Sequence, residues 1–429
     1  MTRRSRTINS VLIAVAITLV AGLTLRFGTN IAALGPIWDE PLMQRVVESI
    51  VTDGWTVQNT IDYEETKGPS FFWTYAALGE LMGTSIDDLR LITLAMFILT
   101  GVPLGLIAAR CGLSSRQIAG AAALYVLLPY NAVLGQMFMS EASFMLGSMF
   151  LLVTFVWGFG SDFRSQRRAA GPIVFGLLLS ILLHHRIHAV AFAGAAMLVS
   201  FERDRWRSWP WWLACFAAGL TRLPLYLRWD GLVSPEYQHL LGIGLRLDSL
   251  TYLAISLLPC TVVLLWPALM DRSLRHCRWW IAAAAVLGLA FGVLAVPDLS
   301  LTAQDGKARY LGMVATALRP LQTGPVLLFA IAALSTIGFS ALAASAAVAF
   351  SLPLTGSAGV VHRLAAWSVL VGWGMYALTR GVVFDRYPLP FVALLPFVLS
   401  ARTPQWLLVL QALGLLGVVI KLAMSHGML

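Results

Sequence analysis

Residues 10–27 read SVLIAVAITLVAGLTLRF, and this stretch decides the fold class. The arginines Arg3, Arg4 and Arg6 precede it, and a basic flank favours the cytoplasmic side of a membrane. A helix needs about 20 apolar residues to cross the hydrocarbon core. A cleaved signal peptide is disfavoured because the apolar run is long and no small-x-small cleavage motif ends it. We therefore expect an uncleaved first transmembrane helix that runs outward.

Apolar runs of similar length recur along the rest of the chain. Of its 429 residues, 58% are hydrophobic and 12% are charged, and the mean hydropathy is +0.77. Soluble domains are about 25% charged, so water is not the solvent of this protein. The sequence predicts an all-α, polytopic transmembrane helical bundle with about 13 spans. Residues 1–429 are predicted to form a single transmembrane domain.

The formal charge of +9 comes from short arginine clusters between apolar runs. Clusters of this kind mark cytoplasmic loops, so a nucleic-acid partner is not expected. The four cysteines lie in or beside predicted spans without metal-ligand spacing, so neither a disulfide framework nor a zinc site is predicted. Alternation of the spans places residues 28–83 in an outer loop, with a juxtamembrane or re-entrant helix at 69–83. It also places outside the segments 184–188, 228–248, 298–324 and 379–390.

Three carboxylates are expected at the outer face. Asp39 and Glu40 open an amphipathic stretch just after the first span. They could cap a surface helix, or one could act as the general base for a hydroxyl that attacks a sugar. Glu141 begins a later span at the same face, where an ionisable residue marks a functional site by default and helix capping is the alternative.

Residues 183–188, LHHRIH, interrupt an apolar run at the outer face, and such a polar break lines a cavity or the interface. The histidines suggest a metal, but no carboxylate in the segment completes a site and their spacing matches no recognised pattern. Arg186 is suited to binding phosphate, with contact to lipid headgroups as the alternative. Further candidates for binding phosphate are Lys67, Arg380 and Arg386, and for contacting substrate His185, His188, Glu236, His239, Asp385 and Tyr387.

The order of these features resembles the GT-C superfamily of integral-membrane glycosyltransferases. The matching segments are Trp38-Asp39-Glu40, Lys67-Gly68-Pro69-Ser70-Phe71-Phe72, Leu128-Pro129 ahead of Glu141, and Arg386-Tyr387-Pro388-Leu389-Pro390. The break at 185–188 is similar to one in the branch that adds a terminal α1,2-glucose from dolichyl-phosphate-glucose. The chain departs from many members in having a single proline after Lys67-Gly68, and acceptor recognition by a large soluble C-terminal domain is not expected.

The resemblance implies an inverting transfer of a sugar from a polyprenyl-phosphate donor to a hydroxyl of a glycan, lipid or protein acceptor. Asp39 would be the base, Glu40 would support it, and Glu141 would orient the substrate. The donor phosphate would be held by Lys67, Arg186, Arg380 and Arg386. No cofactor is expected, and a divalent metal is the less favoured alternative.

The predicted location is the bacterial cytoplasmic membrane, with the active site facing the periplasm or exterior and membrane lipids around the bundle. A transporter or flippase of lipid-linked sugars is the alternative class. Coupled transporters tend to have paired broken helices and ionisable groups near the midplane, and neither is plain in this sequence.

Overall fold

The computed structural model describes residues 3–128, 130–159, 167–240, 244–300, 310–321, 325–354, 356–378, 383–384, 386, 388–425 and 428. These residues form helices and connections, apart from two short strands, β1 (Tyr310–Leu311) and β2 (Val383–Phe384), which pair in parallel. The all-α class is confirmed with that small exception.

Seven helical segments within the described residues are long and apolar enough to cross a membrane, which indicates an integral membrane protein. They are Arg4–Gly28, Ile86–Cys111, Ser140–Phe159, Leu247–Met270, Arg272–Leu294, Pro325–Phe350 and Gln405–Met424.

Seven such segments are fewer than the predicted 13 or so, because several predicted spans form short helices. α7 (Ser115–Leu127), α11 (Val190–Asp204) and α12 (Trp209–Leu220) have 13, 15 and 12 residues, against about 20 for a full crossing. α7 ends at Leu128, whose ψ of 136° is extended, since a residue before proline disfavours the helical region.

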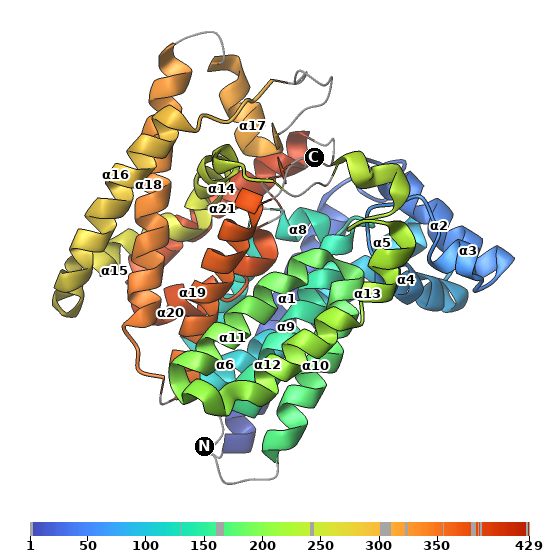
Figure 1. Cartoon of the computed structure of the whole chain (residues 1–429), viewed down its shortest axis with the longest axis horizontal. Coiled ribbons are helices and arrows are strands. Elements are labelled where there is room, and N and C mark those ends of the chain that lie inside the picture. Colours follow the sequence, from blue (N-terminus) through green and yellow to red (C-terminus); the bar gives the residue numbers. More distant parts are fainter. Residues whose placement is uncertain are drawn as a thin grey trace.

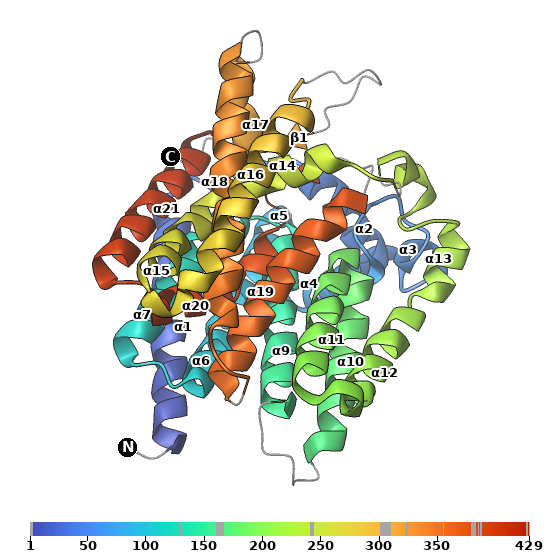
Figure 2. The ribbon, with the colours of Figure 1, turned by 60° about the vertical axis from the view of Figure 1, so that its left-hand side comes forward.

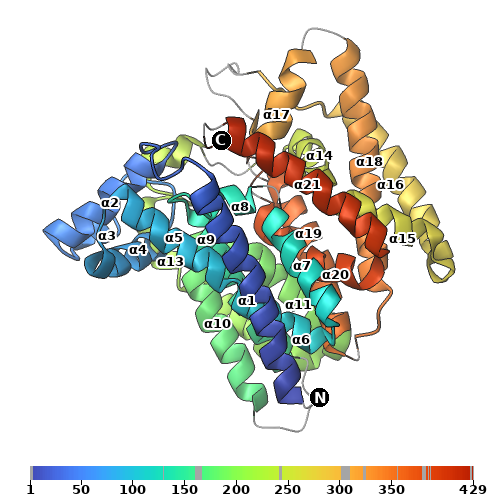
Figure 3. The same ribbon diagram turned by 180° about the vertical axis from the view of Figure 1, so that it is seen from behind.

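The first half of the chain forms a bundle around α9 (Ser140–Phe159), with α5 (Ile86–Leu99), α6 (Gly101–Cys111) and α10 (Arg167–His185) packed against it. α1 (Arg3–Gly28) lies along α6, and the contact is close: a Cβ on Gly105 would lie 2.4 Å from Val11 Cα. Figure 3 shows α7 between α1 and α21 (Gln405–Ser425).

The first outer loop contains three short helices, α2 (Glu40–Asp53), α3 (Val57–Thr60) and α4 (Pro69–Met82), at one side of the bundle (Figure 1). α4 corresponds to the helix expected at 69–83 and has 14 residues, too few to cross a bilayer. Their placement leaves the connecting segments around Asp39 and Lys67 facing the end of α10.

The second half of the chain packs on the first through α19 (Ser357–Met375), which contacts α11. α14 (Leu247–Thr261), η8 (Leu389–Val392) and α20 (Leu395–Arg402) complete this part. α16 (Arg278–Leu294) and α18 (Pro325–Phe350) pair tightly (Figure 2), and in the view of Figure 1 they stand apart from α9 to α13.

Basic segments that are far apart in sequence meet at the end of the molecule where the N-terminus lies (Figure 1). Arg203 donates to the carbonyl of Phe159, and Arg363 lies 3.0 Å from Glu202. Arg402 Nη2 lies 3.4 Å from Ser351 Oγ. The first outer loop lies away from this basic end, as the alternation of spans predicts.

Candidate active site

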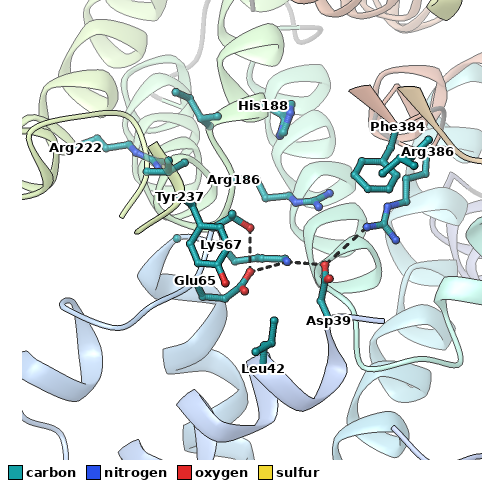
Figure 4. A pocket seen from close by; sticks show the side chains of 15 residues that line it. Asp39, Leu42, Glu65, Lys67, Arg186, His188, Arg222, Tyr237, Phe384 and Arg386 are labelled. Carbon is teal, nitrogen blue, oxygen red and sulfur yellow. Dashed lines mark hydrogen bonds and ion pairs between the residues drawn. The ribbon is translucent and has the colours of Figure 1, made fainter. Parts of the chain in front are cut away.

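A cavity of about 260 Å³ lies among the first outer loop, the end of α10, the start of α13 (Leu223–Trp229) and β2 (Figure 4). Its walls include the apolar side chains of Leu42, Val233, Leu311 and Phe384. The charged residues that line it are Asp39, Glu65, Lys67, Arg186, Arg222 and Arg386. Four cations and two carboxylates therefore share one small space.

Asp39 directly precedes α2, and its side chain, 41% exposed, faces the cavity. Its Oδ2 lies 3.0 Å from Lys67 Nζ and 4.0 Å from Arg386 Nη2. Burial alone would raise the pKa of Asp39, but the positive charges of Lys67 and Arg386 outweigh burial and hold this pKa below its ordinary value of 3.8. Asp39 occupies the N-cap position of α2, but its side chain makes no hydrogen bond to the helix. Only its backbone carbonyl accepts hydrogen bonds from the first turn.

Lys67 is buried between two carboxylates, with Nζ 2.7 Å from Glu65 Oε1 and 3.0 Å from Asp39 Oδ2. Burial alone would lower the pKa of Lys67, but these two negative charges raise it above its ordinary value of 10.5. The next residue, Gly68, donates its N–H to the carbonyl of His185 at 3.0 Å. A Cβ at Gly68 would lie 2.0 Å from the carbonyl oxygen of His184, so the Lys-Gly pair fits this approach to α10.

Glu141 is buried at the start of α9 and bridges two of the predicted phosphate-binding arginines. Its Oε1 lies 3.0 Å from Arg186 Nη2 and 3.5 Å from Arg386 Nε. Among the residues that the structure describes, Oε2 has no hydrogen-bond partner. Glu141 thus orients the cations of the site, and its side chain is only 2% exposed.

Glu40, predicted to support Asp39, faces away from the cavity. Its two oxygens lie 3.0 and 2.7 Å from Arg90 Nε and Nη2, and the backbone N–H groups of Ile37 and Phe138 donate to them. Both side chains of the pair are fully buried. Arg90 also donates to the carbonyls of Ile31, Leu34 and Gly35. Glu40 therefore holds the segment that precedes Asp39 and does not line the site.

The break at 183–188 ends α10 at His185, and a short 3₁₀ turn, η1 (Ile187–Ala189), follows. Its histidines point in different directions. His184 bonds the carbonyl of Ser180, His185 lies 2.8 Å from Ser143 Oγ beneath Phe71, and His188 stacks on Tyr376. Arg186 and His188 line the cavity, whereas His185 does not line it and packs against Ser143 and Phe71.

The remaining predicted residues divide into described and undescribed ones. Arg386 is buried, and its guanidinium lies over the rings of Trp38 and Phe384 at 5.7 and 4.6 Å. Glu236 is exposed on η3 (Pro235–Leu240), and its neighbour Tyr237 lines the cavity instead. Arg380, Asp385 and Tyr387 lie outside the described residues, as does the side chain of His239.

Three ionisable residues that line the cavity, Glu65, Arg222 and Tyr237, were not predicted from the sequence. Arg222 lies between α12 and α13, is 2% exposed, and stands in an otherwise apolar stretch. A lone ionisable residue in such a stretch is a functional candidate by default, so the sequence did contain a sign of Arg222.

No protein-family model matches this chain, and no curated protein gives a significant match. Two solved structures are similar to it: crystal structures of ArnT from Cupriavidus metallidurans, one bound to undecaprenyl phosphate and one in the apo state. The matches cover 95% and 94% of this chain and 77% of the ArnT chain, with TM-scores of 0.45 and 0.44 and sequence identities of 15% and 14%. The residues of the cavity therefore carry the functional conclusion.

Proposed function

We propose that this protein is an inverting glycosyltransferase that moves a sugar from a polyprenyl-phosphate donor to a hydroxyl of a glycan, lipid or protein acceptor. The observation that carries the proposal is an ionised carboxylate, Asp39, in a cavity that also holds the cations Lys67, Arg186 and Arg386. A base beside positive charge suits a reaction that takes a proton from one group and releases a phosphate from another.

Accessibility favours Asp39 over the neighbouring carboxylates as the base. Its side chain is 41% exposed, whereas those of Glu65 and Glu141 are 2% exposed and held by cations. A base must come within hydrogen-bond distance of the proton that it accepts. Glu65 and Glu141 would then set the charge and orientation of Lys67, Arg186 and Arg386.

In the proposed reaction, the acceptor hydroxyl oxygen attacks the anomeric carbon of the sugar while Asp39 accepts the hydroxyl proton. The bond from that carbon to the phosphate oxygen breaks on the opposite face, and its electron pair stays on the phosphate. The configuration at the anomeric carbon is inverted. The departing lipid phosphate gains negative charge, which Lys67, Arg186 and Arg386 would stabilise without reorganising.

The proposed setting is a bacterial cytoplasmic membrane, with the basic end in the cytoplasm and the cavity at the opposite face. The arginines at the N-terminal end support this orientation, because basic residues mark cytoplasmic loops. If the chain crosses the membrane about 13 times, short helices such as α7, α11 and α12 must cross it as well as the longer helices.

Release of polyprenyl phosphate from a panel of polyprenyl-phosphate sugars tests the proposal, with glycan and lipid acceptors supplied to the protein in nanodiscs. We expect Asp39→Asn to be slower than wild type by about 10²-fold or more, the loss typical of removing a general base. Asp62→Asn is the matched control, because Asp62 lies in the same outer loop but pairs with Arg228 outside the cavity.

Equal rates for wild type and Asp39→Asn would contradict the role of Asp39. Loss of activity in Asp62→Asn as well would show that the outer loop had been disturbed as a whole. Thermal unfolding of each variant before the assay establishes that the proteins compared are folded.

A further inference from the structure

Arg222 differs from the other cations of the cavity in having no carboxylate partner among the described residues. Lys67 lies within 3.0 Å of Glu65 and Asp39, Arg186 lies 3.0 Å from Glu141, and Arg386 lies 3.5 Å from Glu141. The charges of these three cations are therefore balanced by carboxylates of the protein itself. The charge of Arg222 is balanced by none of these carboxylates.

The contacts of Arg222 leave much of its guanidinium unsatisfied. Its Nη2 lies 3.4 Å from the carbonyl oxygen of Leu232, and the group lies over the ring of Tyr226 at 5.1 Å. Within the described part of the chain, Nε and Nη1 have no hydrogen-bond partner. A buried charge without a partner is costly in free energy, so a ligand that supplies the missing charge would be bound favourably.

Arg222 and Asp39 lie at opposite sides of the cavity, with Arg186 and Lys67 between them (Figure 4). A ligand that reaches both sides would therefore have an anionic end and an end that meets Asp39.

We propose that Arg222 binds the phosphate of a lipid phosphate and so fixes the direction in which that lipid enters the cavity. The proposal rests on the glycosyl-transfer function above for the identity of the ligand. Guanidinium matches phosphate oxygens well and stays charged when buried. The phosphate lies on the Arg222 side of Asp39, where Arg222 adds its charge to those of Arg186 and Lys67, and the group attached to the phosphate extends toward Asp39.

Binding to the full chain in phosphatidylcholine nanodiscs tests this assignment without turnover, with undecaprenyl monophosphate as the probe. We expect Arg222→Met to weaken binding roughly tenfold to a hundredfold, as loss of a charge-assisted contact does. Arg222→Lys should retain part of the affinity. Arg228→Met is the control, because Arg228 lies on α13, the helix that begins just after Arg222, but is exposed and paired with Asp62.

The melting temperature of the ligand-free protein separates binding from a structural role. Removal of an unpaired buried charge should leave the melting temperature of Arg222→Met equal to or above that of wild type. A structural arginine would instead lower it. An Arg222→Met protein that binds undecaprenyl monophosphate as tightly as wild type does would overturn the proposal, as would equal weakening by Arg228→Met.

Two further probes identify the source of the phosphate. Inorganic phosphate and nanodiscs that contain phosphatidylglycerol are expected to compete weakly, and equal competition by either would overturn the assignment to a lipid phosphate. Failure of one proposal can be distinguished from failure of the other. If wild type turns over donor but Arg222→Met binds undecaprenyl monophosphate as tightly as wild type, the proposed function stands and the assignment of Arg222 fails. If binding of undecaprenyl monophosphate depends on Arg222 but wild type turns over no donor, the assignment of Arg222 stands and the proposed function fails.

Discussion

Asp39 shares its two nearest cations with other carboxylates, and this sharing sets how strongly it holds its negative charge. Lys67 is divided between Asp39 and Glu65, and Arg386 between Asp39 and Glu141. A bound phosphate would compete for the same cations and so raise the pKa of Asp39 toward the range that suits a general base. Lys67 and Arg386 thus keep Asp39 ionised, and a bound donor would make it more basic.

The pH profile of kcat/KM tests the coupling between Asp39 and Lys67. The pKa of Asp39 is lowered from 3.8, so the acid limb of the wild-type profile should lie below about pH 4. Lys67→Met removes the charge that stabilises the carboxylate, and we expect the limb to move to higher pH. Arg228→Met, outside the cavity, should leave it in place; an unmoved limb in Lys67→Met would contradict the coupling.

The same pKa shifts determine how stability depends on pH. The lowered pKa of Asp39 contributes stability that is present above its unfolded value, near 3.8, and is lost as pH falls through the folded value. The raised pKa of Lys67 contributes stability that is present below 10.5 and is lost as pH rises through its folded value. Between about pH 4 and pH 10 the pair should remain intact.

The buried pair of Glu40 and Arg90 should matter for stability more than for chemistry. Glu40→Gln leaves the Arg90 guanidinium buried without its counter-charge, and breaking such a pair costs about 3–5 kcal/mol. Chemical denaturation in detergent measures the loss. The exposed Glu64→Gln is the control and should change the free energy of unfolding by less than about 0.5 kcal/mol. Comparable losses in both variants would contradict the structural role of Glu40.

At the scale of residues, the sequence allowed some site members to be predicted but not others. Asp39, Lys67, Arg186 and Arg386 stand out because they are charged residues beside apolar runs at one predicted face. Glu65 could not be distinguished from Glu64, since both lie in the same polar loop. Only the tertiary fold shows that Glu65 is buried and holds Lys67 while Glu64 is exposed.

At the scale of elements, the site depends on the contact of residues 65–68 with the end of α10. Gly68 lies where the two segments approach most closely. Its N–H donates to the carbonyl of His185, and a Cβ at this position would lie 2.0 Å from the His184 carbonyl oxygen. Ser70 adds a hydrogen bond of 2.8 Å to the carbonyl of Ile181. The polar break in α10 and the start of α4 therefore position each other.

Gly68→Ala should separate these two elements and move Lys67 away from Asp39. We expect a loss of about 1–3 kcal/mol in stability from the overpacked contact, together with slower polyprenyl phosphate release. Gly35→Ala is the matched control, because a Cβ at Gly35 would meet no atom within 4 Å among the described residues. Wild-type stability and rate in Gly68→Ala would show that the loop does not depend on this approach.

Helix boundaries were the least predictable feature at this scale. The apolar stretch 118–134 does not form one helix, because Leu128 leaves the helical conformation before Pro129 and a separate α8 (Asn131–Leu134) follows. Hydropathy gives the apolar stretch but not the interruption. The interruption depends on the restriction that proline places on the preceding residue and is accompanied by a hydrogen bond from the Asn131 side chain to the carbonyl of Tyr125.

At the scale of the whole molecule, the basic end and the cavity are expected on opposite sides of the membrane. Labelling of introduced cysteines with a membrane-impermeant thiol reagent tests this, in a background where Cys111, Cys215, Cys260 and Cys277 are replaced. We expect Asp53→Cys to react in intact cells and Arg275→Cys to react only after the membrane is opened, because basic loops stay in the cytoplasm. The reverse pattern would contradict the orientation.

The membrane class of the protein followed from composition alone, whereas the cavity required the three-dimensional structure. Long apolar segments separate most of the stretches that contribute its lining, which are residues 39, 42, 65–68, 186–188, 222, 233, 237, 311, 384 and 386. Apolar lining residues such as Leu42 and Val233 resemble any lipid-facing or core residue in sequence. Their place beside the charged groups depends on helix packing that hydropathy does not encode.

The central claim is that the protein carries out chemistry on a lipid-linked sugar. The most direct test supplies reconstituted proteoliposomes with a polyprenyl-phosphate sugar and an acceptor, and follows the lipid fraction by mass spectrometry. The account predicts that wild type converts the donor to polyprenyl phosphate as the glycosylated acceptor appears, and that Asp39→Asn does so at least about 10²-fold more slowly. Movement of intact donor across the bilayer, with no polyprenyl phosphate released, would contradict glycosyl transfer and favour a transporter of lipid-linked sugars.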